Sequence, residues 1–330
     1  MIWKEGKISE LVKEGRIIQE RLRSSSRRES KDYAKIFANL MMQGRVSSAL
    51  KILNSDPCTG VHEINKDVIK ALQEKHPTPS PIQENTLLNG PVNEVLTCYF
   101  DNIDEEMVSK ATSLTSGSGG PSQLDALQYN HMLLSRKYKT ENKDLRTQIA
   151  LLARKLATEV IDPDTLEAFT SCRLIPLNKN PGVRPIGVGE VLRRIIGKCI
   201  GWVLKQDIQY AAGPLQTATG LQSGAEAAIH SMKCMFEDEQ TDAVILIDAS
   251  NAFNSLNRQA ALHNVRILCP QIATILINTY RKPARLIILG ASDILSLEGT
   301  TQGDNLAMAF YALGTTPLID TLRIRHQKSG

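Results

Sequence analysis

The spacing of apolar residues predicts a chain that is mainly helical. Apolar residues recur every three to four positions over long stretches, which is the period of a helix with one buried face. On this basis we expect helices at about residues 33–53, 61–75, 103–114, 144–160, 190–210, 224–236 and 255–268, and another that begins within 298–313. The first fifty residues are also helical in pattern, with a break at 21–30 where apolar residues vanish. In the helix at 190–210 the pattern places Arg193, Arg194 and Lys198 on the outer face.

Short apolar runs between turn residues predict strands. The runs at 172–177 and 183–188 are joined by the turn sequence NKNPG and should form a hairpin, in which Pro185 requires an edge strand or a bulge. A second hairpin is expected at 284–289 and 294–299, and a single strand at 94–100. The run at 243–247 is apolar throughout, which is typical of a buried strand. Helices and strands together predict an α+β fold.

A polar stretch rich in proline divides the chain. Residues 76–91, HPTPSPIQENTLLNGP, follow neither a helical nor a strand pattern. We therefore expect a helical N-terminal extension with its linker at residues 1–91 and a main domain at residues 92–330. The glycine-rich sequence at 116–126 follows a helix and is not followed by Lys-Ser or Lys-Thr, so it does not match a phosphate-binding loop.

The composition is that of an ordinary soluble protein, with 42% hydrophobic and 22% charged residues. No apolar run approaches the roughly 18 residues that a membrane span requires, and the N-terminus lacks the apolar core of a signal peptide. We therefore expect an intracellular protein without a membrane partner, in either the nucleus or the cytoplasm. The six cysteines are far apart and form no pair at the spacing of metal ligands, which disfavours a zinc site.

Basic residues are concentrated in parts of the chain, although the net charge is only +4. Residues 173–205 hold seven Lys or Arg against one acid, and the first fifty residues hold eleven against six. Clustered cations bind polyanions because they release the counterions of phosphates, so a nucleic acid is the expected kind of partner. A solvated basic helix face explains the charge of the first fifty residues equally well.

An acid stands directly after the apolar run at 243–247. In the sequence AVILIDASNAFN, at 243–254, this acid is Asp248. Functional groups in α/β architectures gather at the carboxyl ends of strands, so Asp248 is a candidate functional residue. The alternative is that Asp248 only caps the helix that begins near Ser255. These twelve residues alone do not decide between the two interpretations.

Other stretches favour the functional interpretation because, in this order, they resemble the polymerase motifs of reverse transcriptases from non-viral retroelements. They are RLIPLNKNPGVRPIGV at 173–188, QTATGLQSGAEAAIH at 216–230, DASNAFN at 248–254 and EGTTQGD at 298–304. The resemblance covers about residues 116–320. It implies that the fingers and palm of a right-hand polymerase follow the helical N-terminal extension, and that the activity is that of an RNA-directed DNA polymerase.

The resemblance also implies a role for each matching residue. Nucleotide addition is an in-line phosphoryl transfer assisted by two Mg²⁺ ions, which prefer carboxylate and carbonyl oxygens. By resemblance, Asp248 and the backbone carbonyl of Ala249 bind Mg²⁺. The residues expected to bind substrate are Arg184 and Lys179 at the triphosphate, Phe253 against a ribose 2′-hydroxyl, and Gln302 and Gly303 at the nucleotide and the template base. Each of these residues also has a purely structural explanation: Arg184 as an exposed strand residue, Phe253 as a ring in the core and Gln302 as a helix cap. Their combination in this order favours the polymerase interpretation.

One motif of the family is missing. Reverse transcriptases carry an aromatic-x-Asp-Asp motif downstream of the glutamine helix, whereas this sequence has no Asp-Asp pair. Because one carboxylate cannot hold two metal ions, we expect an incomplete palm that is inactive by itself. It would come from a truncated gene or an eroded element copy, or be one piece of a longer product that includes the missing C-terminal part. Asn305, where the family leads us to expect proline, is a smaller departure.

The resemblance defines the expected partners and one competing hypothesis. A polymerase of this kind would bind an RNA template, a DNA primer or hybrid, and a dNTP. The competing hypothesis is a non-catalytic nucleic-acid-binding remnant that keeps the basic fingers surface.

Overall fold

The chain forms two compact units in the computed structural model, residues 1–59 and residues 60–330. The structure describes residues 6–7, 9–10, 12–17, 33–46, 49–50, 60–179, 181–217, 219–238, 242–243, 245–301 and 303–327. In the first unit, helix α2 (Tyr33–Met42) occupies the first half of the helix predicted at 33–53. The predicted break at 21–30 lies outside the described residues. The candidate site residues all belong to the second unit.

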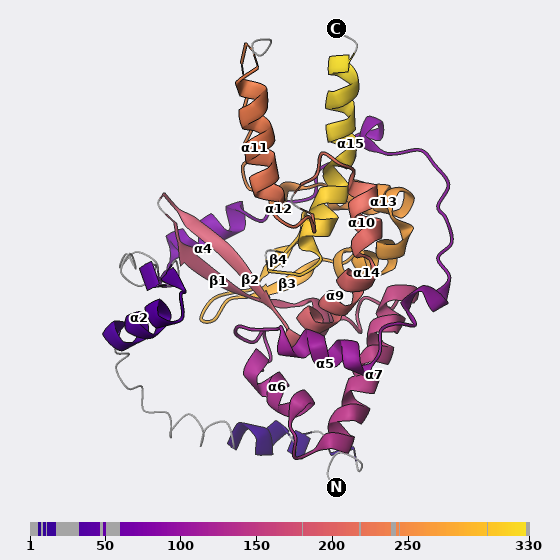
Figure 1. Cartoon of the computed structure of the whole chain (residues 1–330). Helices are drawn as coiled ribbons and strands as arrows, with labels where there is room; N and C mark the ends of the chain where they lie inside the picture. The colour runs from indigo at the N-terminus through magenta and orange to yellow at the C-terminus, as the bar shows by residue number, and fades with distance from the viewer. Residues whose placement is uncertain are drawn as a thin grey trace. The chain divides into compact units, whose positions relative to one another are not determined.

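Helices make up most of the second unit (Figure 1). In chain order they are α4 (Lys66–Glu74), the short 3₁₀ helices η1 (Glu84–Thr86) and η2 (Thr97–Phe100), α5 (Glu105–Ser113), α6 (Ala126–Leu134), α7 (Lys139–Thr158), α8 (Glu167–Thr170), α9 (Val191–Val203), α10 (Lys205–Ala212), α11 (Gly224–Phe236), α12 (Ala252–Ser255), α13 (Arg258–Leu268), α14 (Pro270–Tyr280) and α15 (Ala307–Gln327). Over the described parts of the chain, none of the helices is both long and apolar enough to cross a membrane.

Four strands form one mixed sheet, in the order β2-β1-β3-β4. The strands are β1 (Cys172–Asn178), β2 (Val183–Gly189), β3 (Ala284–Ile287) and β4 (Ile294–Ser296). β1 pairs with β2 and β3 with β4 in antiparallel hairpins, while β1 and β3 are parallel. Both predicted hairpins are therefore confirmed, and Pro185 lies on the edge strand β2. The combination of helices with this sheet also confirms the α+β class.

Two hydrophobic cores hold the second unit together. The larger one is helical and includes the fully buried Phe100, Ile195, Ile272 and Phe310. In the smaller core, Val68 and Leu72 of α4 pack with strand residues such as Leu174, Leu286 and Ile294. Because this apolar face of α4 is buried with the sheet, residues 60–91, which we expected in the N-terminal extension, fall within the second unit.

The structure differs from the predicted elements in several places. The strand predicted at 94–100 is wrong: Thr97–Phe100 form the 3₁₀ helix η2, and Phe100 is its one buried residue, without the alternation of a strand. The helix predicted at 190–210 is divided into α9 and α10 near Leu204. α6 and α14 were not predicted, and α15 continues to Gln327, well beyond the stretch at 298–313 in which it was expected to begin.

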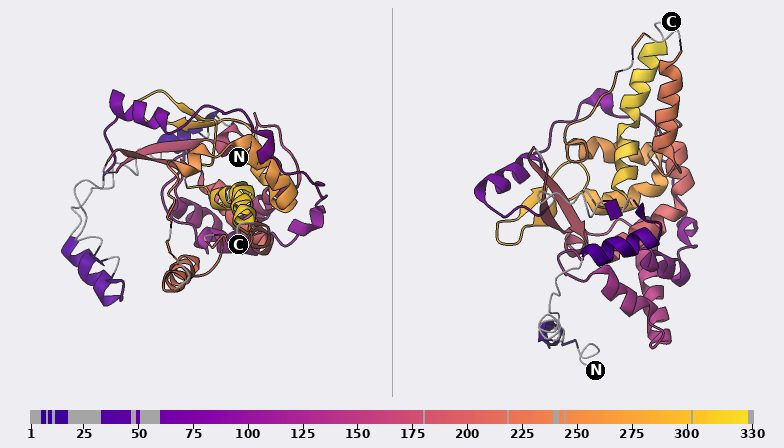
Figure 2. Two further views of the ribbon diagram at one scale, coloured as in Figure 1. Left: turned by 90° about the horizontal axis from the view of Figure 1, so that it is seen from above. Right: turned by 60° about the vertical axis from the view of Figure 1, so that its left-hand side comes forward.

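The buried strand predicted at 243–247 is also wrong. The described residues of this run form no strand, and the side chains of Ile245, Leu246 and Ile247 are 83%, 77% and 85% exposed. A strand forms only where a neighbour takes up its backbone hydrogen bonds, and no described strand lies beside this run. Helix α11, just before it, is also little buried: only its first residue, Gly224, is inaccessible. α11 and the end of α15 project from the same side of the second unit (Figures 1 and 2).

Candidate functional site

A cavity of about 630 Å³ in the second unit brings together the residues that the sequence singled out. Its wall is formed by the tip of the β1–β2 hairpin, the segment at 248–254, the end of α4 and the turn before α15. The lining residues are Lys75, Lys179, Val183, Arg184, Pro185, Ile186, Asp248, Ala249, Ser250, Asn251, Ala252, Phe253, Asn254 and Gly303. Six of the seven predicted site residues are therefore on one wall, although they are up to 124 positions apart in the sequence (303 − 179). Gln302, the seventh, lies outside the described residues.

The hairpin supplies two cations to this cavity. In its register Leu177 lies opposite Arg184, and the backbone N–H of Lys179 donates to the carbonyl of Gly182 at 3.1 Å, which closes the turn. β2 alternates between buried and more exposed residues, so Val183 and Pro185 face the core while Arg184 is exposed. Two exposed cations of one hairpin thus line the cavity, Lys179 in the turn and Arg184 on β2.

The segment after Asp248 folds into a compact turn. Asn251 has a left-handed backbone conformation, with φ of +53°, which asparagine tolerates better than most residues. Its carbonyl accepts hydrogen bonds from the backbone N–H groups of Asn254 and Ser255, at 3.0 and 3.1 Å, and α12 begins there. Asp248 itself is exposed and borders the cavity, and neither of these bonds involves its side chain. The capping interpretation of Asp248 is therefore not supported.

Phe253 is held by a second aromatic ring. Its ring stacks on that of Tyr311 from α15, with centroids 4.9 Å apart and planes inclined by 29°. Such a pair is worth about 0.5–1.5 kcal/mol beyond the area that it buries. Phe253 therefore presents a fixed, half-buried ring to the cavity, and α15 supplies a support that the sequence did not indicate.

Two glycines place the turn at 298–304 against the rest of the wall. Gly299 has φ of +64°, and a Cβ there would lie 2.1 Å from the carbonyl oxygen of Phe253. Gly303 has φ of +101°, and a Cβ there would lie 2.7 Å from the carbonyl oxygen of Gly187 in β2. Only glycine permits both the positive φ and the close approach. The turn consequently touches the hairpin on one side and the Phe253 segment on the other.

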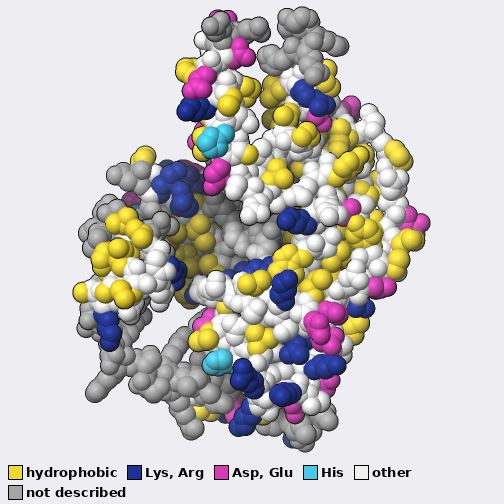
Figure 3. Space-filling model, viewed as in Figure 1, with side chains coloured by type: hydrophobic (Ala, Val, Ile, Leu, Met, Phe, Trp, Pro, Cys, Tyr) yellow, Lys and Arg dark blue, Asp and Glu magenta, His cyan; other side chains and the backbone are white. Residues whose placement is uncertain are grey.

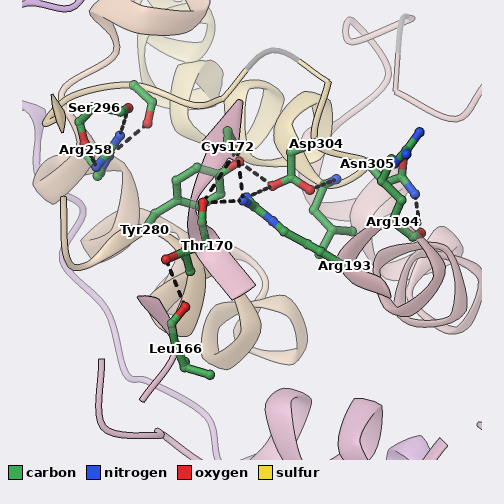
Figure 4. A network of polar contacts seen from close by, with 12 residues as sticks. Leu166, Thr170, Cys172, Arg193, Arg194, Arg258, Tyr280, Ser296, Asp304 and Asn305 are labelled. Atoms are coloured by element: carbon green, nitrogen blue, oxygen red, sulfur yellow. Dashed lines mark hydrogen bonds and ion pairs between the residues drawn. The ribbon is translucent and has the colours of Figure 1, made fainter. Parts of the chain in front are cut away.

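A buried ion pair anchors this turn from behind (Figure 4). Asp304 Oδ2 accepts a hydrogen bond from Arg193 Nη2 of α9 at 2.7 Å and another from the Tyr280 hydroxyl at 2.5 Å. Both charged side chains are only 5% exposed. Burial alone would lower the pKa of Arg193, but the adjacent Asp304 carboxylate raises it overall, so the arginine stays charged. Burial and the same carboxylate raise the pKa of Tyr280. The expectation that Arg193 faces outward is wrong, because it neutralises a buried acid.

Arg258 forms a second buried anchor. Its guanidinium donates to the carbonyls of Ser296, Glu298 and Gly299 and to the Ser296 hydroxyl, at 2.8–2.9 Å. Its backbone N–H donates to Glu298 Oε2 at 2.6 Å. Burial lowers the pKa of Arg258 to about 10, which leaves it protonated at neutral pH. Arg193 and Arg258 both lie over the ring of Tyr280. The guanidinium carbon is 5.8 Å from the ring centroid for Arg193 and 5.5 Å for Arg258.

Asn305 also has a structural role. Its side-chain amide donates to the backbone carbonyl of Arg194 at 2.5 Å, which ties the start of α15 to α9. Proline has no group that could donate this bond. The departure from the family pattern at this position thus has a local explanation.

The oxygen ligands in the cavity suit one Mg²⁺ ion better than two. Asp248 is the one acid among the described lining residues, and no group of three His, Cys, Asp or Glu side chains within the described chain is arranged to hold a metal. A Mg²⁺ ion that arrives with a nucleotide takes most of its ligands from phosphates and water, so Asp248 and the Ala249 carbonyl fit it. They do not fit a two-metal centre, since Asp304 is committed to Arg193.

Sequence reasoning missed three contributors to this site: Lys75, Tyr311 and the Asn251–Asn254 pair. Lys75 is 173 positions before Asp248 (248 − 75), and no local pattern marks it as a neighbour. The polar repeat Asn251, Asn254 and Asn257 could have signalled a structured turn. No protein-family model matches this chain, and no curated protein matches it significantly.

Proposed function

We propose that this chain is the nucleotide-binding part of an RNA-directed DNA polymerase of the reverse-transcriptase type, with fingers and a partial palm. The observation that carries the proposal is the convergence of Lys179, Arg184, Asp248, Phe253 and Gly303 on one cavity wall. Each of them also has, from the sequence alone, an expected role in nucleotide binding. Chance would not be expected to bring them together from three distant segments.

Each residue has a task that its position suits. Arg184 binds phosphate oxygens in a bidentate manner, with Lys179 beside it as a second positive charge. Asp248 and the Ala249 carbonyl hold the Mg²⁺ ion that accompanies the triphosphate; bound there, the ion neutralises phosphate charge. Phe253, fixed by Tyr311, meets the sugar and leaves no room for a 2′-hydroxyl. Gly303 lets the turn approach closely enough to lie along the nucleotide.

Binding of a fluorescent dATP analogue in the presence of Mg²⁺ tests the proposal. We expect dATP to compete better than ATP, and Phe253→Ala to remove this preference. Arg184→Ala should weaken dATP binding by about 10- to 100-fold, since a hydrogen bond between charged groups contributes about 1.5–3 kcal/mol. Arg285→Ala is the matched control, because Arg285 is a half-exposed strand arginine outside the cavity. Equal binding of dATP and ATP would refute the selection of deoxyribose by Phe253, and with it the polymerase assignment. Equal effects of the two arginine variants would refute a nucleotide site at Arg184.

Primer extension on a poly-rA template tests the catalytic part of the proposal. With Mg²⁺ present we expect primer–template binding but no incorporation by this chain, because the described cavity offers a single carboxylate. Incorporation of nucleotides by this chain would show that a single carboxylate is sufficient for catalysis, and would contradict the conclusion that the site does not fit two metal ions.

A second candidate function is non-catalytic binding of nucleic acid. Figure 3 shows Lys and Arg side chains gathered over the region of α6 and α7, interspersed with acids. Arg136, Lys137 and Lys139, where α6 gives way to α7, are exposed. Binding of a labelled RNA/DNA hybrid at rising salt distinguishes the candidates. An affinity for the hybrid that falls steeply with salt, without any dNTP binding, would favour the second function. An affinity that does not change with salt would exclude a surface that follows the phosphate backbone.

A further inference from the structure

Lys75 is a third cation on the cavity wall. It is the C-cap residue of α4, it is half-buried, and it lines the same cavity as Lys179 and Arg184. Among the ion pairs found between described residues, none involves any of these three cations. The described wall thus presents three cations and one acid, Asp248, which is an excess of two positive charges. An excess of that sign is suited to a polyphosphate, which carries several negative charges.

The backbone of Lys75 is clamped to the segment that carries Asp248. The side-chain amides of Asn251 and Asn254 both donate to the Lys75 carbonyl, at 2.9 and 3.0 Å. Asn254 Nδ2 also donates to Asn251 Oδ1 at 3.2 Å, which orients the two amides together. The carbonyl at a helix C-cap has no acceptor partner within its own helix, so the two amides satisfy a group that α4 leaves open. The clamp therefore determines where Lys75 lies relative to Asp248.

The chain that follows Lys75 is held along the same face. The side-chain amide of Asn257 donates to the Ser80 carbonyl at 2.9 Å, and the Ser80 N–H donates to Glu298 Oε1 at 3.1 Å. Residues 75–80 are thus attached at both ends to the two segments that build the site, 251–257 and 298–304. Such double attachment restricts the motion of the 75–80 segment and lowers the entropy cost of holding Lys75 in place.

We propose that Lys75 is a third polyphosphate-binding residue of this cavity, positioned by the clamp of Asn251 and Asn254. The inference rests on the proposed function for the identity of the ligand as a nucleoside triphosphate. The recognition itself requires only a chain of phosphates. Lys75 acts as a compact point charge with three rotatable donors, which complements the planar guanidinium of Arg184 in the same cavity.

Displacement of 3′-mant-dATP by inorganic tripolyphosphate, with Mg²⁺ present, tests the assignment. Tripolyphosphate has neither a base nor a sugar, so it reports on the cations alone. Lys75→Ala should weaken tripolyphosphate and mant-dATP about tenfold, and Lys75→Arg should retain most of the affinity. Lys70→Ala is the matched control, since Lys70 is an exposed lysine of the same helix outside the cavity. We expect its affinity to stay within about twofold of the unmodified protein.

The outcomes separate the inference from the proposed function. If Lys75→Ala and Lys70→Ala bind tripolyphosphate equally well, Lys75 is not a ligand, while the dNTP site is unaffected. If tripolyphosphate binding depends on Lys75 but dATP binds no better than ATP, the inference holds and the polymerase assignment fails. If the unmodified protein binds neither 3′-mant-dATP nor tripolyphosphate, both the inference and the proposed function are overturned. Far-ultraviolet circular dichroism of each variant establishes that the fold is intact.

Discussion

Removing the charge of Asp304 should reveal how strongly the buried ion pair holds the turn at the cavity. Asp304→Asn keeps the size of the side chain and one oxygen acceptor, but it leaves Arg193 buried without its counterion. At the observed 2.7 Å, the attraction between the charges is about 6 kcal/mol for an effective dielectric constant of about 20. Desolvation of both ions offsets part of it, and breaking one side of a buried pair costs about 3–5 kcal/mol. That loss is a large part of the free energy of unfolding of a typical domain, which is about 5–15 kcal/mol.

Urea denaturation followed by circular dichroism measures this loss. Glu159→Gln is the control, because it removes a carboxylate from the exposed pair with Lys155 and should cost only about 0.3–0.5 kcal/mol. The double variant Arg193→Met with Asp304→Leu removes both charges, so it should be more stable than Asp304→Asn alone. A cost for Asp304→Asn no larger than that of Glu159→Gln, or a double variant less stable than the single one, would refute the reasoning.

Three further predictions concern a titrating group, a backbone conformation and an exposed run. Burial lowers the pKa of His76 below 6.5, so unfolding takes up a proton and stability falls as the pH drops below that value. His76→Gln should flatten this fall when melting temperatures are measured between about pH 8 and pH 5. An unchanged dependence of the melting temperature on pH would contradict this prediction. Gly303→Ala should lower the free energy of unfolding, measured by urea denaturation, by about 1–3 kcal/mol. Gly290→Ala should lower it less, because Gly290 has a positive φ but open space around it. Equal losses would show that the contact of Gly303 with β2 is unimportant. Leu246→Lys should change stability by less than about 0.5 kcal/mol because the side chain is 77% exposed, whereas a loss of about 2 kcal/mol would indicate burial.

Local patterns predicted the elements whose partners are near in the sequence. The β1–β2 hairpin was predictable because its turn lies between two apolar runs, and its pairing needs only that turn. The start of α5 was predictable because Asp104 caps the helix by accepting from the Met107 N–H at 2.8 Å. Gly303 was expected at the nucleotide only through the family resemblance, and its approach to Gly187 was not visible in the sequence.

Predictions failed where a distant partner decides the outcome. The run at 243–247 has the composition of a buried strand, but a strand also requires neighbours, and no described strand provides them. Arg193 looked like a surface cation because its burial depends on Asp304, 111 residues later. The fingers-and-palm interpretation and the roles of Asp248 and Arg184 remain proposals, which the binding assays above address.

The sequence by itself determined the hairpins, most of the helices and the residues with suitable chemistry for a phosphate site. It did so because helical periodicity, turn residues and side-chain chemistry are properties of short segments. Only the tertiary structure decided that Lys179, Arg184, Asp248, Phe253 and Gly303 share one cavity, and that Lys75 joins them. The physical reason is that these contacts depend on packing between segments far apart in the chain, such as the bonds from Asn251 and Asn254 to the Lys75 carbonyl.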